Sequence, residues 1–342
     1  MFVEENDEHS LLWSGPRCGS STVKTHFGLD HSYSFADVPH YLRQLSSQQK
    51  NQSIYIDNHG ENSCIGASLL PSGMKISPVL DKLRVIKSAA ELHQMEAGCK
   101  LSAAAFVSTI RSSKESTSES LLAARMEFEC KQRGATGLSY IPVIASGDRA
   151  NIIHYTRNDL PLKEGELVLM DAGGKFGPFC TDITRTIPHS SFTSAQRELY
   201  NAVLRAQRVC IEAVSEFKNF KELSLETLNG LAMLQLVQEL SHLGFKSPED
   251  AVNKLFPHSI GHYLGMDLHD TPSISYSQPL VPGMVITIEP GLYIPYDSDY
   301  PSRFHGIGIR IEDDIAITQD GMKNLTESVP RDPEELEHLI NQ

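Results

Sequence analysis

The sequence predicts an α+β protein in which a partial α/β unit, residues 1–80, precedes a larger domain, residues 84–335, built from two similar halves. Two observations support this prediction. The first 80 residues hold short apolar runs separated by turn residues, too few for a complete doubly wound domain. Residues 85–187 and 193–318 each contain two helices, a histidine-bearing segment and two acid-bearing strands in the same order, which predicts a pseudo-two-fold axis.

The N-terminal unit is predicted to combine short strands with one helix. Leu11–Trp13 ends at the turn residues Ser14–Pro16 and is interpreted as a strand. Ser53–Asp57 is interpreted in the same way, because its apolar residues alternate with a period near two. Phe35–Leu45 is predicted to be helical. The turn pair Ser72–Gly73 marks the predicted boundary with the larger domain.

Four amphipathic helices are predicted in the larger domain, over residues 88–110, 116–133, 193–214 and 223–243. Ser88–Glu91 and Ser116–Glu119 have the S-x-x-E pattern of a capping box, whose first and last residues bond each other's backbone and side chain. The first box precedes apolar residues at helical spacing from Leu92 to Ile110. Gly134 and Gly244 are the predicted helix stops.

Six short apolar segments of the larger domain are interpreted as strands. They are Leu138–Ala145, Asn151–Tyr155, Leu167–Asp171, Phe179–Thr186, Val285–Glu289 and Ile307–Thr318. Because a glycine-rich turn separates Leu167–Asp171 from Phe179–Thr186, these two segments are predicted to form a hairpin.

The composition argues against several classes of function. A formal net charge of −13 is unfavourable for nucleic-acid binding, which needs a basic face. No apolar stretch reaches about 18 residues, so no membrane partner is expected. The six cysteines are scattered without a C-x-x-C pair, which favours a reducing compartment. The acidic segment Met1–Glu8 resembles neither a signal peptide nor an arginine-rich transit peptide, so an intracellular protein is predicted.

Three histidines, His258, His262 and His269, fall within one short glycine-containing stretch. The glycines let the backbone fold closely around the imidazoles, which can bind metals or transfer protons. Histidines in a loop are nevertheless more often hydrogen-bonded structural residues. The functional interpretation therefore depends on which other groups join them.

Four carboxylates lie at the ends of apolar strands or on the strands that return from them. They are Asp171, Asp182, Glu289 and Glu312. Any one of them alone would be interpreted as a turn or cap residue. A buried carboxylate without a partner is unfavourable, so each of these four needs a cation or hydrogen-bond donors. A hairpin would also bring the first two acids close together, because paired strands lie roughly 5 Å apart.

Four acids with one histidine predict an oxygen-rich metal site. Such a site suits manganese, with cobalt, iron or zinc as alternatives. Five protein ligands are too many for one catalytic ion and suit two divalent ions about 3.5–4 Å apart. A hydroxide that bridges the two ions, formed from water whose pKa drops to roughly 7, is the predicted nucleophile.

These residues together resemble the "pita-bread" metallopeptidases, a group that includes methionine aminopeptidases, prolidases and aminopeptidase P. The resemblance covers about residues 84–335. It depends on the spacing Asp171-x10-Asp182, the His-x3-His-x6-His stretch, Ile288–Gly291 and Arg310–Glu312. Its implied fold is a pita-bread catalytic domain with two pseudo-symmetric halves.

Within this group the chain is most similar to aminopeptidase P, in its mitochondrial-type X-prolyl branch. Gly261–Thr271 is similar to that branch nearly throughout, and Leu12–Arg17 resembles the end of its N-terminal domain. The implied reaction is removal of the N-terminal residue from peptides with proline at position 2. Such peptides are the expected partners.

The resemblance also implies roles for the site residues. Asp171 would bind one ion, His262 and Glu289 the other, and Asp182 and Glu312 would bridge the two. Glu289 would also transfer the proton of the attacking water.

The remaining implied roles concern the substrate and the support of the ligands. His154, His258 and His269 would contact the substrate. The last two would hold the scissile carbonyl oxygen and the proline side. Arg310 would orient one of the acidic ligands.

Three alternatives stay open. A methionine aminopeptidase would not carry the Trp13–Arg17 segment. A prolidase has the same ligands and would differ by hydrolysing dipeptides only. A non-enzymatic binding protein on this fold would typically have lost ligands, whereas all five are present here.

The main departure from the family lies at the N-terminus. The chain is expected to begin inside the N-terminal domain of aminopeptidase P, so that this domain is truncated. A homodimer is a further expectation, which a truncated domain weakens. The resemblance implies a mitochondrial location, but the missing presequence makes a cytoplasmic one equally expected.

Overall fold

The computed structural model describes residues 1–48, 55–56, 74–216, 222–296 and 299–342. The chain divides into two compact units, Met1–Val79 and Leu80–Gln342. Of the predicted strand Ser53–Asp57, only Tyr55–Ile56 are described. They form β3, which pairs in parallel with β4 (Met74–Lys75). The predicted boundary at Ser72–Gly73 lies outside the described residues.

The first unit contains short strands and helices. Strand β1 (Phe2–Val3) pairs in parallel with β2 (Tyr33–Ser34). The helices are α1 (Glu8–Ser14), α2 (Ser20–His26), the 3-10 helix η1 (Phe35–Asp37) and α3 (Val38–Gln48). The helix predicted at Phe35–Leu45 is therefore confirmed.

The strand predicted at Leu11–Trp13 is wrong, because these residues lie in α1. Asp7 begins the helix: its side chain accepts a bond from the backbone of Ser10, whose hydroxyl approaches the Asp7 backbone in return. This capping box stabilises a helical turn over residues whose apolar character alone does not separate helix from strand.

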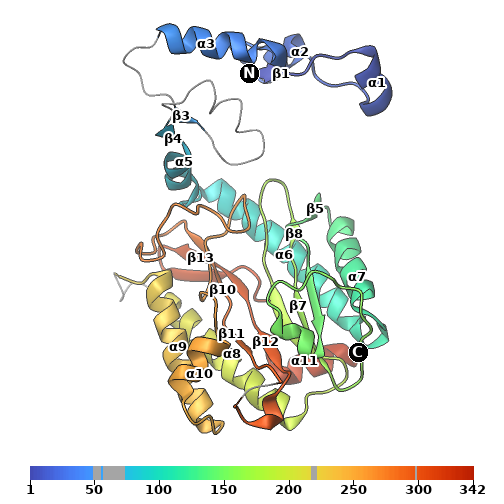
Figure 1. Cartoon of the computed structure of the whole chain (residues 1–342), viewed down its shortest axis with the longest axis vertical. Coiled ribbons are helices and arrows are strands. Elements are labelled where there is room, and N and C mark those ends of the chain that lie inside the picture. Colours follow the sequence, from blue (N-terminus) through green and yellow to red (C-terminus); the bar gives the residue numbers. More distant parts are fainter. Residues whose placement is uncertain (49–54, 57–73, 217–221, 297–298) are drawn as a thin grey trace. The chain divides into compact units, whose positions relative to one another are not determined.

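The second unit contains helices of 8–23 residues, shown in Figure 1 on both sides of the central strands. They are α5 (Ser77–Arg84, which begins in the first unit), α6 (Ala89–Arg111), α7 (Glu119–Gln132), α8 (Ser194–Ser215), α9 (Leu225–His242), α10 (Pro248–Leu255) and α11 (Pro333–Ile340). The four predicted helices correspond to α6, α7, α8 and α9. The sequence analysis missed α5, α10 and α11, which are short.

The strands of the second unit pair in antiparallel fashion in small sheets. They are β5 (Gly137–Leu138), β6 (Val143–Ser146), β7 (Leu167–Asp171), β8 (Gly174–Lys175), β9 (Thr184–Pro188), β10 (Val285–Ile288), β11 (Gly291–Tyr293), β12 (Gly308–Arg310), β13 (Asp313–Thr318) and β14 (Gly321–Asn324). The sheet orders are β6-β7-β9, β10-β13-β14, β11-β12 and β5-β8.

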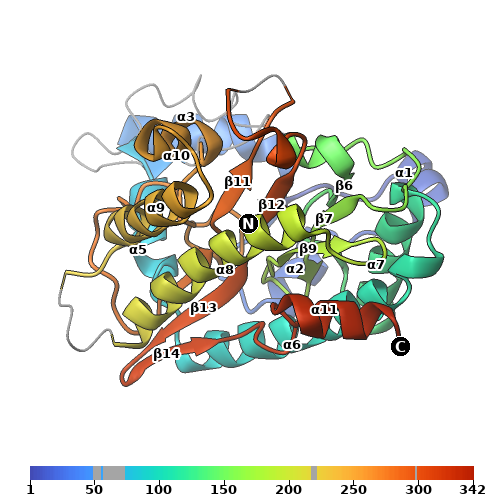
Figure 2. The ribbon, with the colours of Figure 1, turned by 90° about the horizontal axis from the view of Figure 1, so that it is seen from below.

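These elements form two similar halves. In the first half, α6 packs on α7 and the sheet is β6-β7-β9; in the second, α8 packs on α9 and the sheet is β10-β13-β14. The C-terminal helix α11 contacts α6, α8 and β9 and so joins the two halves (Figure 2). One large hydrophobic core contains residues of both halves.

Capping and burial explain α6. Ser88 forms the predicted capping box with Glu91. The apolar stripe then packs inward, with Met95, Cys99 and Phe106 fully buried. The second predicted box is wrong in detail, because Ser118 rather than Ser116 caps α7. Its predicted partner Glu119 turns into the interior instead.

Four predicted strands need correction. Leu138–Ala145 is interrupted between β5 and β6, which pair with β8 and β7 respectively. Asn151–Tyr155 is not a strand: it contains the end of the 3-10 helix η4 (Gly147–Asn151) and a turn. Phe179–Thr186 becomes regular only at Thr184, where β9 begins. Ile307–Thr318 is interrupted between β12 and β13, which pair with different partners. Glu312 lies in that interruption.

Candidate active site

The site lies where β9 passes the interruption between β12 and β13. The backbone N–H of Glu312 donates to Thr184 O at 3.0 Å, and the Thr184 hydroxyl donates to Glu312 Oε2 at 2.6 Å. The backbone N–H of Asp182 donates to Asp314 Oδ2 at 3.1 Å. These bonds connect the two halves and place Asp182 beside Glu312.

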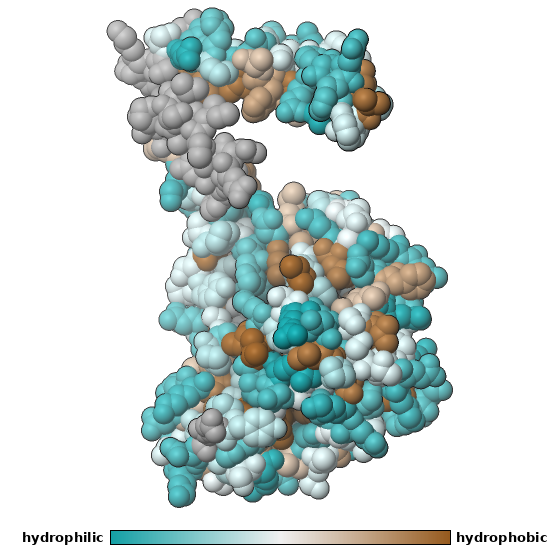
Figure 3. All heavy atoms as spheres, turned by 45° about the vertical axis from the view of Figure 1, so that its right-hand side comes forward, coloured by the Kyte–Doolittle hydropathy of each residue, from teal (hydrophilic) through white to brown (hydrophobic). Residues whose placement is uncertain are grey.

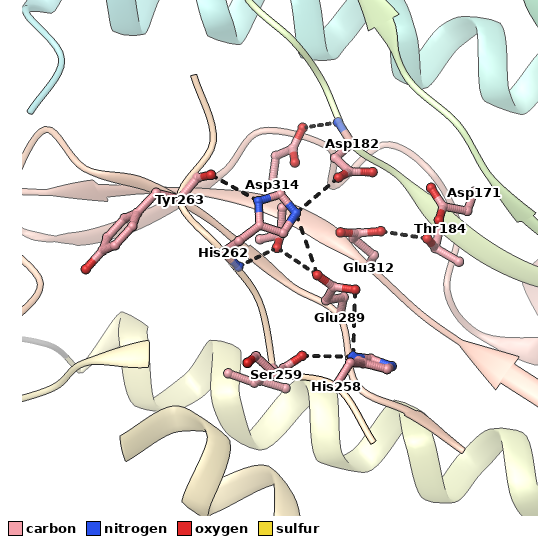
Figure 4. A network of polar contacts seen from close by, with 12 residues as sticks. Asp171, Asp182, Thr184, His258, Ser259, His262, Tyr263, Glu289, Glu312 and Asp314 are labelled. Carbon is pink, nitrogen blue, oxygen red and sulfur yellow. Dashed lines mark hydrogen bonds and ion pairs between the residues drawn. The ribbon is translucent and has the colours of Figure 1, made fainter. Parts of the chain in front are cut away.

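Three of the predicted ligands meet directly. Asp182, His262 and Glu312 each offer one ligand atom, and these atoms lie within 4.8 Å of one another. His262 Nε2 lies 3.3 Å from Asp182 Oδ2 and 3.7 Å from Glu289 Oε1 (Figure 4). All three residues of the trio are buried. The group therefore combines oxygen and nitrogen donors in a protected position.

A backbone contact orients the His262 ring. Its Nδ1 lies 3.0 Å from Tyr263 O, and because a carbonyl only accepts, Nδ1 carries the hydrogen. The lone pair of the neutral ring is then on Nε2, which faces the carboxylates. This arrangement is typical of a metal-binding histidine, whose second nitrogen is held by an outer partner.

Asp171 is held at the other side of the cluster. The Tyr140 hydroxyl lies within hydrogen-bond distance of Asp171 Oδ1 and, at 2.5 Å, of Asp182 Oδ1, and donates its one hydrogen between these two acids. Arg310 donates from Nη2 to Asp171 Oδ2 and from Nη1 to the Tyr293 hydroxyl at 2.8 Å. Arg310, which is expected to orient one of the acidic ligands, contacts Asp171. Like Asp171, Arg310 lies in a strand that ends at the site.

The charges of the cluster are not balanced by protein groups alone. Burial, together with the charge of Asp182, raises the pKa of Asp171, although Arg310 opposes the shift. Burial raises the pKa of Glu289 to about 7, and burial with the neighbouring acids raises that of Glu312. Carboxylates with such raised pKa values are stabilised in the ionised form by a cation. The donor set therefore fits divalent metal ions.

The pKa of His262 moves in the opposite sense to that of an isolated buried histidine. Burial favours the neutral ring, but the bond to Asp182 and the charge of Glu289 outweigh it and raise the pKa to about 9. In the metal-free protein this raised pKa favours a second proton on Nε2, the nitrogen that faces Asp182.

A cavity of about 340 Å³ opens over the acids. Its charged and polar lining includes all five predicted ligands, Arg310, His154 and His269. Its apolar lining consists of Ile141, Val143, Ile153 and Leu268. On the face of the second unit in Figure 3, hydrophobic groups likewise stand beside strongly hydrophilic ones. This mixture suits a ligand with both apolar and polar parts.

The predicted substrate histidines are placed differently from one another. His154 and His269 line the cavity, and the His269 ring lies 4.5 Å from that of His262. His258 does not line it. Its Nδ1 lies 2.9 Å from Ser259 O and its Nε2 accepts from the Tyr293 hydroxyl at 2.8 Å. Burial lowers the pKa of His258 to about 4, which keeps this ring neutral.

Several contacting residues were missed by sequence reasoning. Tyr140 bonds two acids, Thr184 bonds Glu312, and Asp314 accepts from the Asp182 backbone. Tyr140 lies in an irregular segment with no periodic signal. Asp314 follows two other acids, a pattern that usually marks a solvated turn, yet it is fully buried.

Two family matches cover much of the chain. Residues 93–319 match metallopeptidase family M24, and residues 1–55 match the N-terminal domain of aminopeptidase P. Human Xaa-Pro aminopeptidase 3 is 38% identical over 100% of this chain and 70% of its own length. Intermediate cleaving peptidase 55 of Saccharomyces cerevisiae is 36% identical over 99% of this chain and 70% of its own length.

Solved structures agree with these matches. Icp55 from Saccharomyces cerevisiae superposes with a TM-score of 0.90 at 39% identity, covering 99% of this chain and 80% of that one. Aminopeptidase P from Escherichia coli superposes with a TM-score of 0.89 at 31% identity, covering 99% and 82%.

The fold and the acid-rich site define a metal-dependent hydrolase with the pita-bread fold. The chain belongs to metallopeptidase family M24. It is a metallo-aminopeptidase of the Xaa-Pro aminopeptidase group, similar to the Icp55 branch, as the sequence predicted. Divalent metal ions as cofactors and peptides as substrates follow from this membership. None of the described helices is long and apolar enough to cross a membrane.

Proposed function

We propose that this protein is an Xaa-Pro aminopeptidase that uses two divalent ions, manganese being the preferred metal, to release the N-terminal residue of peptides with proline second. The observation that carries the proposal is the convergence of Asp182, His262 and Glu312 beside Asp171 and Glu289 at one cavity. The names of the similar human and bacterial proteins support the substrate class.

Five residues would hold the ions: Asp171, Asp182, His262, Glu289 and Glu312. Oxygen-rich donor sets favour manganese over a structural zinc site. When bound, two such ions would lower the pKa of water to roughly 7 and so supply the nucleophile at neutral pH. The role of the protein is to place the substrate and to move the proton.

Glu289 is the proposed proton carrier. Its carboxyl group is partly buried and lines the cavity, and desolvation raises its pKa to about 7, which suits both accepting and releasing a proton near neutral pH. Thr287 donates to Glu289 Oε1 at 3.3 Å and fixes its orientation. Glu289 would take a proton from the attacking water and pass it to the leaving proline nitrogen.

Neutral imidazoles would orient the substrate. His154 and His269 line the cavity together with the apolar residues Ile153 and Leu268. Burial and the charge of His262 lower the pKa of His269, so that its ring is neutral and can donate one hydrogen bond to a carbonyl oxygen. The apolar wall would accept the first side chain and the proline ring.

His258 would act through Tyr293 rather than by direct substrate contact from the cavity. A chain of hydrogen bonds runs from Arg310 through the Tyr293 hydroxyl to His258. This chain would fix the wall of the site beside Glu289, whose Oε2 lies 4.0 Å from His258 Nδ1.

The deciding experiment combines metal replacement with peptide profiling. Chelated protein should be inactive and should regain activity with Mn²⁺, and a peptide library should show cleavage only where proline is second. Cleavage of Xaa-Pro dipeptides alone would favour the prolidase alternative. No turnover with manganese, cobalt, iron or zinc would favour a binding protein and contradict the proposal.

Oligomeric state and location stay predictions. A relative from Arabidopsis thaliana is named as mitochondrial, which supports the mitochondrial alternative over the cytoplasmic one. Fractionation of cells that produce the tagged protein would distinguish the two locations. Light scattering would test the homodimer.

A further inference from the structure

A second, larger hollow adjoins the catalytic cavity. This groove has a volume of about 860 Å³ and lies between α10, the loop after η4 and the segment that follows β11. Its lining includes the buried side chains Ala251, Leu255 and Tyr293. Lys246, Lys254, Asp250 and Asp299 add charged groups to the same lining. None of these four charged groups takes part in the reaction described above.

The groove is continuous with the catalytic site. Ile153 lines both hollows. Tyr293 lines the groove, while its hydroxyl bonds Arg310 and His258 at the edge of the cavity. Pro257, next to His258 in the chain, also lines the groove. The groove therefore begins at the wall formed by His258 and Tyr293.

The size of the cavity favours such a continuation. A cavity of about 340 Å³ that also holds metal ligands has room for only a short piece of peptide. An aminopeptidase cuts after the first residue, so everything beyond the second residue must leave the cavity. The groove that shares Ile153 offers this path.

The lysines of the groove are available for a ligand. Lys246 precedes α10 and Lys254 lies in its last turn, and both are exposed. Within the part of the chain that the structure describes, neither ammonium has a carboxylate within 4.0 Å. The neighbouring Asp250 and Asp299 balance the overall charge, so the groove is not a general anion-binding surface. A single carboxylate could still pair with one ammonium.

We propose that this groove binds the substrate residues that follow proline and that Lys254, assisted by Lys246, binds the carboxylate at the C-terminus of a short peptide. Lys254 is assigned first because it lies four positions before His258 in the chain. The inference rests on the proposed function. It makes the enzyme a peptidase that prefers peptides longer than a dipeptide.

The test compares peptide length and terminal charge. Ala-Pro, Ala-Pro-Ala and Ala-Pro-Ala-Ala, each as free acid and as amide, are assayed with the manganese-loaded protein and with Lys254→Met and Lys246→Met. Methionine keeps an apolar stem and removes the charge. For at least one of the three peptide lengths, kcat/KM for the free acid should fall about tenfold in Lys254→Met, which is equivalent to ~1.4 kcal/mol. The kcat/KM for the amide of the same length should stay unchanged.

Two controls separate charge from fold. Lys131→Met removes an exposed lysine of α7 that pairs with Glu127, far along the chain from the groove, and should leave every substrate unaffected. Ser247→Trp places a bulky ring at the groove where the native side chain makes no cap bond. It should slow the longer peptides and spare Ala-Pro.

The outcomes distinguish the two proposals. Equal kcat/KM for acid and amide in all proteins would overturn the groove inference and leave the proposed function intact. So would wild-type kcat/KM for every free-acid peptide in Lys254→Met together with normal cleavage of the longer peptides by Ser247→Trp. Failure of the manganese-loaded wild type to cleave any of the peptides, Ala-Pro included, would contradict the proposed function and the inference that rests on it.

Discussion

Glu289 shows how surroundings change the chemistry of one residue. The same carboxyl group that titrates near 4.5 in a solvated peptide has a pKa of about 7 here, because it is buried and faces other acids. For His262 burial alone would lower the pKa, but the partners Asp182 and Glu289 outweigh burial and raise it. Neither shift can be read from the residue type.

We expect Glu289→Gln to fold normally and to lose most of its turnover. The amide keeps the shape of the side chain but cannot accept a proton, and general acid–base groups typically contribute about 10²–10⁴-fold. Steady-state kinetics with a proline-second peptide and a circular dichroism melt test this. As a control, Glu164→Gln at an exposed position should leave kcat unchanged; full activity of Glu289→Gln would refute the assigned role.

At the scale of elements, Glu119 organises the loop that carries His154. Its side chain is fully buried and accepts from Ser146 N, Arg149 Nε, Tyr155 Oη and Leu160 N at 2.7–3.0 Å. The two ends of the loop are thus held to the start of α7. Sequence reasoning assigned this residue to a capping box because the pattern alone does not show where a side chain turns.

Glu119→Gln should therefore destabilise the protein and slow the reaction. An amide presents two N–H groups to donors that need an acceptor, and bonds to a charged group are each worth roughly 1.5–3 kcal/mol. We expect a loss of about 2–4 kcal/mol and a reduced kcat/KM through His154. Urea melts and kinetics measure both.

The matched control lies on the same helix. Glu127→Gln removes an exposed carboxylate that pairs with Lys131, a contact worth less than about 1 kcal/mol. Equal stability of the Glu119 and Glu127 variants would show that the buried network does not hold the loop.

The histidine segment depends on a close backbone approach. A Cβ on Gly261 would lie 2.0 Å from Thr287 O, and Thr287 N in turn donates to His262 O at 2.9 Å. The segment and β10 are therefore in direct contact, and any side chain at position 261 separates them. This contact positions His262 relative to Glu289.

Gly261→Ala is expected to cost at least about 1–3 kcal/mol of stability and to weaken metal binding. Gly230→Ala is the control, because a Cβ there meets open space inside α9 and should stabilise by ~0.5–1 kcal/mol. Thermal melts and manganese titrations of both variants provide the comparison. Unchanged metal affinity in Gly261→Ala would show that the contact does not position His262.

At the scale of the whole molecule, the site makes stability depend on pH and metal. In the metal-free protein the pKa values of Glu289, Glu312 and Asp171 are raised, so their favourable contribution is present at low pH and is lost as they ionise. The stabilising contribution of Glu289 is lost as the pH rises from about 4.5 to about 7. The contribution of His262 is lost as the pH rises from 6.5 to about 9.

Chelated protein should accordingly melt at a lower temperature as the pH rises from 5 to 9. One pKa unit corresponds to about 1.4 kcal/mol, so Glu289 alone accounts for up to about 3 kcal/mol. Bound Mn²⁺ should remove or reverse the slope, since a cation stabilises the ionised acids. Differential scanning calorimetry with and without metal tests this, and a rising melting temperature in the chelated protein would contradict it.

Much of the fold could be predicted because periodicity and capping are local. The stripe from Leu92 to Ile110 identified α6, and the predicted capping box of Ser88 and Glu91 begins it. Local signals failed where helix and strand look alike over a few residues, as in α1. They also failed for the interruption at Glu312, because only the pairing of β12 and β13 with different strands creates it.

The sequence by itself determined the types and order of the proposed ligands and the family resemblance, because these depend on residue identity and spacing. The tertiary structure decided which groups meet. Tyr140 reaches two acids, His258 bonds Tyr293, and Asp182 stands beside Glu312 across a contact between two halves. Such contacts join residues more than 30 positions apart, and no local pattern encodes them. Burial then sets the charges, because desolvation depends on everything that surrounds a group.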